Sequence, residues 1–128
     1  LAINRCKQCC HVQLSVRVNP DLLFKDYAYV SGTTKTQLDY FKWFAEFAIE
    51  KYGTTPTKVL DIGCNDGSQL NAFQDIGSET YGVDPAENLF PTSSQRHNVS
   101  CGFFTGKEGN GLGDFRNLVA ATLSLMLG

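Results

Sequence analysis

Four residues of this sequence have the types and the spacing of a nucleoside-binding site. Gly63 and Gly67 stand four positions apart, and glycine lets a backbone approach a ligand closely where a Cβ would take the ligand's place. Asp84 ends an apolar stretch, where its carboxylate is placed to accept hydrogen bonds from two ribose hydroxyls. Asp61 lies just before the first glycine. A carboxylate there can hold loop amides or, through water, the amino group of a ligand.

The segments around these residues predict the elements that position them. Residues 58–63 are a short apolar run stopped by glycine, which indicates a β-strand. Ser68 is a candidate N-cap for a following helix, and Gly77 is expected to end it. The apolar face of that helix is Leu70, Phe73 and Ile76. Residues 80–84 predict the next strand. This order of strand, glycine turn, helix, strand and terminal acid is the nucleotide-binding half of a doubly wound α/β sheet.

The glycine turn distinguishes two classes of nucleotide ligand. In the dinucleotide-binding pattern G-x-G-x-x-G, Asn65 and Ser68 would both have to be glycine. The acids Asp61 and Asp66 also suit a cationic ligand better than a pyrophosphate. The form D-x-G-x-x-x-G resembles motif I of the class I S-adenosylmethionine-dependent methyltransferases, and we favour methyl transfer over dinucleotide binding. The donor-binding residues that we expect are Asp61, Gly63, Cys64, Asn65, Gly67 and Asp84.

Length, charge and cysteine usage narrow the class of protein. A chain of 128 residues has room for about one domain. The net charge of −2 gives no basic field for nucleic acid, and no apolar run approaches the roughly 18 residues of a membrane span. The cysteines form no disulfide-scaffold pattern, so we expect a cytoplasmic protein. The chain starts at Leu1 without a methionine, and we expect both ends to be cut from a longer protein.

The amino-terminal pair Cys6-x-x-Cys9 has the spacing at which two thiolates on one turn share a zinc ion. One such knuckle is half of a tetrahedral site, and nothing downstream supplies a second pair at suitable spacing. Two interpretations stay open. The pair is the second knuckle of a zinc ribbon whose first knuckle precedes Leu1, or it is a pair of free thiols. A redox pair is disfavoured, since no strand–helix context surrounds it.

Two further segments precede the glycine turn. Residues 26–34 are dense in hydroxyl groups beside a glycine, and they predict a loop into a helix with Thr34 or Thr36 as the cap. In a functional interpretation, this loop places a phenol over a ligand pocket. Residues 37–52 predict a long amphipathic helix stopped by Gly53. Its broad aromatic face favours domain packing over cofactor contact.

Beyond Asp84 the sequence predicts shorter elements. Residues 85–96 indicate a short polar helical region, and residues 99–103 a third strand. We place His97 on a surface helix and expect no catalytic role for it. Residues 115–127 are apolar again and predict the next strand.

Taken together, these segments resemble the sugar C-methyltransferase family, which methylates a carbon of nucleotide-linked deoxysugars. The matching stretches are Cys6-x-x-Cys9 followed by residues 12–14, residues 23–33, and residues 60–67, of which Ile62-Gly63-Cys64-Asn65-Asp66-Gly67 is the most specific. The resemblance implies an α/β fold: an incomplete class I methyltransferase (Rossmann-like) sheet, preceded by part of a zinc ribbon and a long amphipathic helix. It divides the chain into a ribbon remnant, residues 1–24, and the amino-terminal part of a methyltransferase domain, residues 25–128.

The resemblance also implies an activity and its partners. It implies S-adenosylmethionine as the cofactor, structural zinc held by Cys6 and Cys9 only with the missing knuckle, and a nucleotide-linked keto-deoxysugar as the substrate. The mechanism that the resemblance implies begins when a base removes a proton from the carbon next to the ketone, and the resulting enolate then attacks the donor methyl. Tyr29 matches the second tyrosine of the family's Y-x-Y-x-S segment and is the candidate catalytic residue. The alternatives are another acceptor or a catalytically inactive binding module.

The carboxyl end departs from this family pattern. Residues 118–121 fit an expected strand, but residues 122–127 lack the asparagine-valine pair and the histidine that relatives carry. Read one base earlier, codons for residues 121–127 can spell Asn-Val-Ile-Ser-His-Ala. We therefore hypothesise a frameshifted or prematurely ended reading frame, in a chain that keeps the donor-binding turn but lacks methyltransferase activity. The nucleotide sequence tests this hypothesis.

Overall fold

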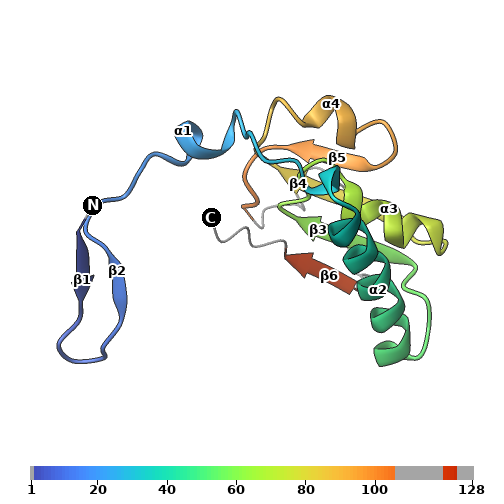
Figure 1. The fold of residues 1–128 in the computed structure, drawn as a ribbon, viewed down its shortest axis with the longest axis horizontal. Coiled ribbons are helices and arrows are strands. Elements are labelled where there is room, and N and C mark those ends of the chain that lie inside the picture. The colour runs from blue at the N-terminus through green and yellow to red at the C-terminus, as the bar shows by residue number, and fades with distance from the viewer. Residues whose placement is uncertain (1, 106–119, 124–128) are drawn as a thin grey trace.

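A computed structural model describes residues 2–105 and 120–123 of the chain. The strands are β1 (Ile3–Arg5), β2 (Val12–Leu14), β3 (Lys58–Ile62), β4 (Glu79–Asp84), β5 (Asn98–Cys101) and β6 (Ala120–Leu123). The helices are α1 (Pro20–Phe24), the 3-10 turn η1 (Ser31–Thr33), α2 (Lys35–Tyr52), α3 (Ser68–Asp75) and α4 (Phe90–Ser93). Figure 1 shows α2 and α3 side by side along the sheet.

The central sheet has four strands in the order β5-β4-β3-β6. All three pairings are parallel, with Asp61 of β3 opposite Gly82 of β4 on one side and opposite Thr122 of β6 on the other. The carboxyl ends of parallel strands meet at one edge of a sheet. The residues that follow β3 and β4 are therefore brought together, as the sequence predicts.

Successive side chains of β3 point to opposite faces of the sheet, and they belong to two different apolar clusters. Val59 packs with side chains of α2, α3 and the loop after β3: Phe41, Ala45, Ala48, Cys64, Leu70, Ala72 and Phe73. Leu60 and Ile62 belong to the second cluster, with Tyr81 and Val83 of β4. Of the predicted apolar face of α3, Leu70 and Phe73 are fully buried. These contacts fix β3, β4 and α3 relative to one another.

Helix α2 is the predicted long helix, and it starts two residues earlier than expected. The Thr34 hydroxyl accepts the Gln37 amide at 3.3 Å, so Thr34 is the cap, and Gly53 ends the helix with φ +74°. Its apolar side chains are not confined to the buried face. Tyr40, Trp43 and Phe47 form an exposed row, in which the Tyr40 and Trp43 rings are tilted at 5.6 Å and the Trp43 and Phe47 rings are stacked at 5.4 Å between centroids.

Strands β1 and β2 form an antiparallel hairpin that stands apart from the sheet (Figure 1). Residues 12–14, one of the stretches that resemble the sugar C-methyltransferases, form β2, and Ile3–Arg5 forms its partner β1. The C-x-x-C knuckle makes the turn: the Cys6 amide donates to the His11 carbonyl at 2.8 Å, and the Cys10 amide to the Cys6 carbonyl at 3.1 Å. Every hairpin strand residue is exposed, so the hairpin has no core of its own.

Several local predictions need correction. Ser68 is the first residue of α3, not its cap, because Gly67 in the left-handed region occupies the cap position. The helical region expected through Arg96 is a single turn, α4. The strand expected at residues 99–103 is β5, one residue earlier at its start and two residues shorter at its end. Within residues 115–127, β6 confirms a strand, and the remaining positions lie outside the described residues. No described helix is long and apolar enough to cross a membrane.

Candidate functional site

The site is built around the sharp turn between β3 and α3. Gly63 and Gly67 both have φ +83°, and Asn65 has φ +52°, a region that favours glycine and asparagine. The Gly63 amide donates to the Val83 carbonyl of β4 at 2.7 Å, and the Gly67 amide to the Cys64 carbonyl at 2.9 Å. The chain therefore leaves β3, is held against β4, and reverses into α3 within five residues. The two glycines of the motif stand where this path requires them.

Asp84 lies beside this turn, at the end of β4. One of its carboxylate oxygens accepts the Asn65 amide at 2.8 Å, and the other accepts the Ala86 amide at 2.8 Å. The side chain is only partly buried. A carboxylate has about four acceptor positions, so two bonds to the backbone leave capacity for ligand hydroxyls. Sequence reasoning predicted a ligand role for Asp84 and missed that it also holds the glycine turn.

Two other predicted site residues are buried. Asp61 has no exposed surface and stands within β3, opposite Gly82. A Cβ on Gly82 would lie 2.6 Å from Cys64 Sγ, so the Cys64 side chain packs directly on β4. Burial, followed by the charges of Asp61 and Asp84, raises the pKa of Cys64. The thiol is therefore neutral and packed, as expected for an inert thiol. Any ligand contact by Cys64 has to come from its backbone.

Asn65 and Asp66 bind a distant part of the chain. Asn65 Nδ2 donates to the Tyr29 carbonyl at 3.0 Å, and Asn65 Oδ1 accepts the Ser31 amide at 2.9 Å. Asp66 Oδ2 accepts the Gly32 amide at 3.0 Å. A Cβ on Gly32 would lie 2.6 Å from that oxygen, which explains the glycine at this position. The motif's Asn-Asp pair thus fastens the segment that carries Tyr29 to the glycine turn.

The same segment is fastened again beyond β4. Asn88 Oδ1 accepts the Tyr27 amide at 2.9 Å, and Asn88 Nδ2 donates to the Tyr27 carbonyl at 2.9 Å. The Glu87 amide donates to the Lys25 carbonyl at 2.8 Å, and the two side chains form an ion pair at 3.4 Å. Sequence reasoning did not single out Asn88. Its only signal was its place four residues after Asp84.

Tyr29 is brought to the site by these contacts. Its backbone carbonyl is bound to Asn65, and its side chain is 45% exposed. The candidate catalytic tyrosine therefore lies beside the predicted donor-binding turn, on a segment whose backbone is fixed. The chemical role of its hydroxyl stays a prediction.

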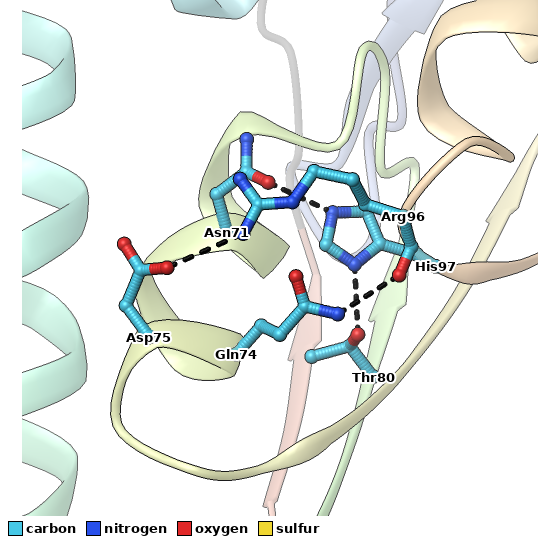
Figure 2. A network of polar contacts seen from close by, with 6 residues as sticks. All are labelled: Asn71, Gln74, Asp75, Thr80, Arg96 and His97. Carbon is cyan, nitrogen blue, oxygen red and sulfur yellow. Dashed lines mark hydrogen bonds and ion pairs between the residues drawn. The ribbon is translucent and has the colours of Figure 1, made fainter.

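His97 is in the turn that leads into β5, and its ring is buried, so its placement on a surface helix was wrong. Figure 2 shows the ring between α3 and β4: Nδ1 lies 2.7 Å from Thr80 Oγ1, and Nε2 lies 3.2 Å from Asn71 Oδ1. Because an amide oxygen only accepts, we assign the proton to Nε2, and Nδ1 then accepts the Thr80 hydroxyl. Burial, and next the charge of Arg96, lowers the pKa of His97.

The His97 ring also packs against the glycine turn at Gly67. A Cβ on Gly67 would lie 2.8 Å from His97 Cδ2. Neighbouring contacts tie the same segment to α3, since Gln74 Nε2 donates to the Arg96 carbonyl at 2.9 Å, and Arg96 pairs with Asp75 at 3.3 Å (Figure 2). The His97 ring therefore supports the glycine turn through packing, and its lack of a catalytic role stays a prediction.

Within the described residues, no group of three or more His, Cys, Asp or Glu side chains is arranged to hold a metal ion. Cys6 and Cys9 lie on one exposed turn, and the backbone amides of Cys9 and Gln8 lower the pKa of Cys6. This turn would favour a thiolate, but two thiolates supply half of a tetrahedral zinc site. Zinc binding by this pair remains a prediction.

Comparisons with known proteins give one curated relative and several solved structures. The chain is 30% identical over 92 residues to the C-methyltransferase NovU of Streptomyces niveus, a match that covers 71% of this chain and 22% of the relative. The chain thus spans about a fifth of the length of the curated relative that it matches. No protein-family model matches.

Comparison with solved structures gives partial matches at low sequence identity. The plantazolicin methyltransferase BpumL, in complex with a pentazolic desmethylPZN analog and SAH, is 22% identical, with a TM-score of 0.48 over 56% of this chain and 30% of that chain. BamL, in complex with a triazolic analog and SAH, is 21% identical, with a TM-score of 0.43 over 52% of this chain and 26% of that chain.

Proposed function

Since this chain belongs to the S-adenosylmethionine-dependent C-methyltransferase family, we propose that residues 61–67 and Asp84 bind S-adenosylmethionine. One observation carries the proposal. Asp84 ends β4 next to the glycine turn, is partly buried, and keeps acceptor capacity after binding two backbone amides. These free acceptor positions suit a ribose, whose two neighbouring hydroxyls can donate to one carboxylate. The acids around the turn suit a cationic sulfonium better than a phosphate.

Each residue of the proposed site has its own role. S-adenosylmethionine supplies an electrophilic methyl group when it is bound. Asp84 accepts ribose hydroxyls, and the turn between Gly63 and Gly67 offers a close-approaching backbone for the rest of the donor. Tyr29, on a fixed backbone beside the turn, is placed to exchange a proton with an acceptor or to donate a hydrogen bond to a developing oxyanion. Asp61 holds the amides of the turn or, through water, binds the amino group of the methyl donor.

The acceptor that we propose for the whole protein is a nucleotide-linked keto-deoxysugar, methylated at a carbon next to its ketone. The support is the C-methyltransferase relative and the I-G-C-N-D-G string at residues 62–67. We also propose a cytoplasmic location, because all five cysteines are free thiols, which fits a reducing compartment. Structural zinc at Cys6 and Cys9 belongs to this proposal only as part of a longer protein.

The donor site is tested by titrating the chain with S-adenosylhomocysteine in a calorimeter. Asp84→Ala removes two ribose hydrogen bonds, worth about 1.5–3 kcal/mol, so Kd should rise roughly 10- to 150-fold. Glu79→Ala is the matched control, since it removes the same charge at the opposite end of β4. Unchanged binding in Asp84→Ala removes Asp84 from the site. An absence of binding by the unaltered chain would refute the donor site as a whole.

A further inference from the structure

Residues 25–33, here called the strap, cross the edge of the sheet where β3 and β4 end. The strap is fastened at Tyr29, Ser31 and Gly32 to the loop after β3. At Lys25 and Tyr27 it is fastened to the loop after β4. In both loops one asparagine forms the main attachment, and each of the two amide groups both donates to and accepts from the strap backbone. Two-point pairing of this kind fixes the position and the orientation of the strap.

Asp84 lies between the two attachments. One carboxylate oxygen binds the amide of Asn65, the first attachment residue. The other binds the amide of Ala86, two residues before Asn88, the second. The residue proposed to bind the ribose is therefore linked to both ends of the strap through the loops that it holds. A donor on Asp84 has to lie next to the stretch of strap between Tyr27 and Ser31, which carries Tyr29.

We propose that Asn88 is a positioning residue, which together with Asn65 holds the strap as one wall of the donor site, so that donor binding and strap attachment stabilise each other. This inference rests on the proposed donor site. The coupling is reciprocal by thermodynamic necessity. The free energy by which strap attachment strengthens donor binding equals the free energy by which the bound donor strengthens strap attachment. It follows that Asn88, which is exposed and bonds through its side chain to the backbone of Tyr27, should influence ligand affinity.

Asn88 is the better residue to alter, because it is exposed, whereas Asn65 is 4% exposed and holds the turn itself. Asn88→Ala removes both bonds to Tyr27. Asn88→Asp keeps an acceptor for the Tyr27 amide and loses the donor to the Tyr27 carbonyl, so its effect should be intermediate. Asn98→Ala, at an exposed asparagine that starts β5, is the matched control.

The experiment combines calorimetric titration with S-adenosylhomocysteine and amide hydrogen exchange at Tyr27, Ser31 and Gly32. In the unaltered chain, the ligand should slow exchange at Tyr27. Asn88→Ala should speed exchange there without ligand, abolish the protection by ligand, and raise Kd about three- to tenfold. Asn98→Ala should change none of these. The exchange readout separates a positioning role from a general loss of stability, which would speed exchange in the core strands as well.

The outcomes are distinguishable. If the unaltered chain does not bind S-adenosylhomocysteine, the proposed function fails and this inference fails with it. If it binds without protecting Tyr27, or if Asn88→Ala binds within twofold of the unaltered chain, the inference alone is overturned. Weaker binding without faster exchange at Tyr27 also overturns it. If Asn88→Ala does not fold, Asn88→Asp is measured in the same way. Unchanged Kd or unchanged exchange at Tyr27 in that variant overturns the inference.

Discussion

Replacing Gly67 by alanine tests the role of the turn and of the histidine behind it. Two effects should add. Alanine at φ +83° costs about 1–2 kcal/mol, because a Cβ in the left-handed region crowds the following carbonyl. The new Cβ would also lie 2.8 Å from His97 Cδ2, so the buried ring has to shift.

The cost of that shift follows from what holds the ring. His97 is bonded to Thr80 at 2.7 Å and to Asn71 at 3.2 Å, and stretching each bond costs about 0.5–1.5 kcal/mol. Gly67→Ala should therefore lower the free energy of unfolding by about 2–5 kcal/mol in total. Gly53→Ala is the matched control. Gly53 has φ +74°, and nothing lies within 4 Å of an added Cβ, so only the backbone cost of about 1–2 kcal/mol applies.

Urea unfolding with linear extrapolation measures both variants, and a double variant tests the contact itself. His97→Ala should destabilise the Gly67→Ala background less than the unaltered chain, since removing the ring relieves the clash. Titration with S-adenosylhomocysteine should show lost affinity for Gly67→Ala and near-normal affinity for Gly53→Ala. Equal destabilisation by the two glycine substitutions, or additive behaviour in the double variant, would refute the contact between Gly67 and His97 as the cause.

Three further predictions concern the support, the core and the hairpin. Burial lowers the pKa of His97 in the folded chain, so the neutral ring contributes stability above about pH 6.5, and this contribution should be lost as the pH falls through the folded pKa. Urea unfolding from pH 8 to 5 should show the loss in the unaltered chain and not in His97→Gln. Phe73→Ala should cost about 3–5 kcal/mol in the same assay, against less than about 1 kcal/mol for Phe47→Ala at the surface. Zinc should bind Cys6 and Cys9 weakly or not at all in this chain, as measured by competition with a chelator; tight stoichiometric zinc would mean that a further ligand completes the site.

The strand–turn–helix–strand unit could be predicted because its signals are local. An apolar run, glycines at a fixed spacing and the period of the following helix all lie within residues 58–84. The left-handed φ angles of Gly63 and Gly67 are what their residue type indicates. The cap of α3 was mispredicted for an equally local reason. Asp66 accepts both the amide and the hydroxyl of Ser68, so the serine donates where it was expected to accept.

The strap and His97 could not be predicted from sequence. The side-chain bonds that hold the strap join residues 34 to 61 positions apart, and the backbone bond between Glu87 and Lys25 joins equally distant segments, so they leave no periodic pattern. A lone histidine gives no pattern either, and its burial depends on Thr80, Asn71 and Gly67 being close in space. At the carboxyl end, β6 pairs with β3 through its backbone. Backbone hydrogen bonds can form whatever the side chains are, so the presence of β6 does not test the frameshift hypothesis. The nucleotide sequence tests it.

Asp84 illustrates why a predicted ligand residue needs a test that separates its roles. Its carboxylate holds the amides of Asn65 and Ala86, so Asp84→Ala would weaken ligand binding through a loosened turn even if no ribose hydroxyl touched it. A ligand lacking one hydroxyl resolves the two causes. If Asp84 binds the ribose, 2′-deoxy or 3′-deoxy S-adenosylhomocysteine should bind the unaltered chain about 10-fold more weakly than the parent ligand, yet bind Asp84→Ala as well as the parent does. The same loss in both proteins would mean that Asp84 only holds the turn, and that another group receives the ribose.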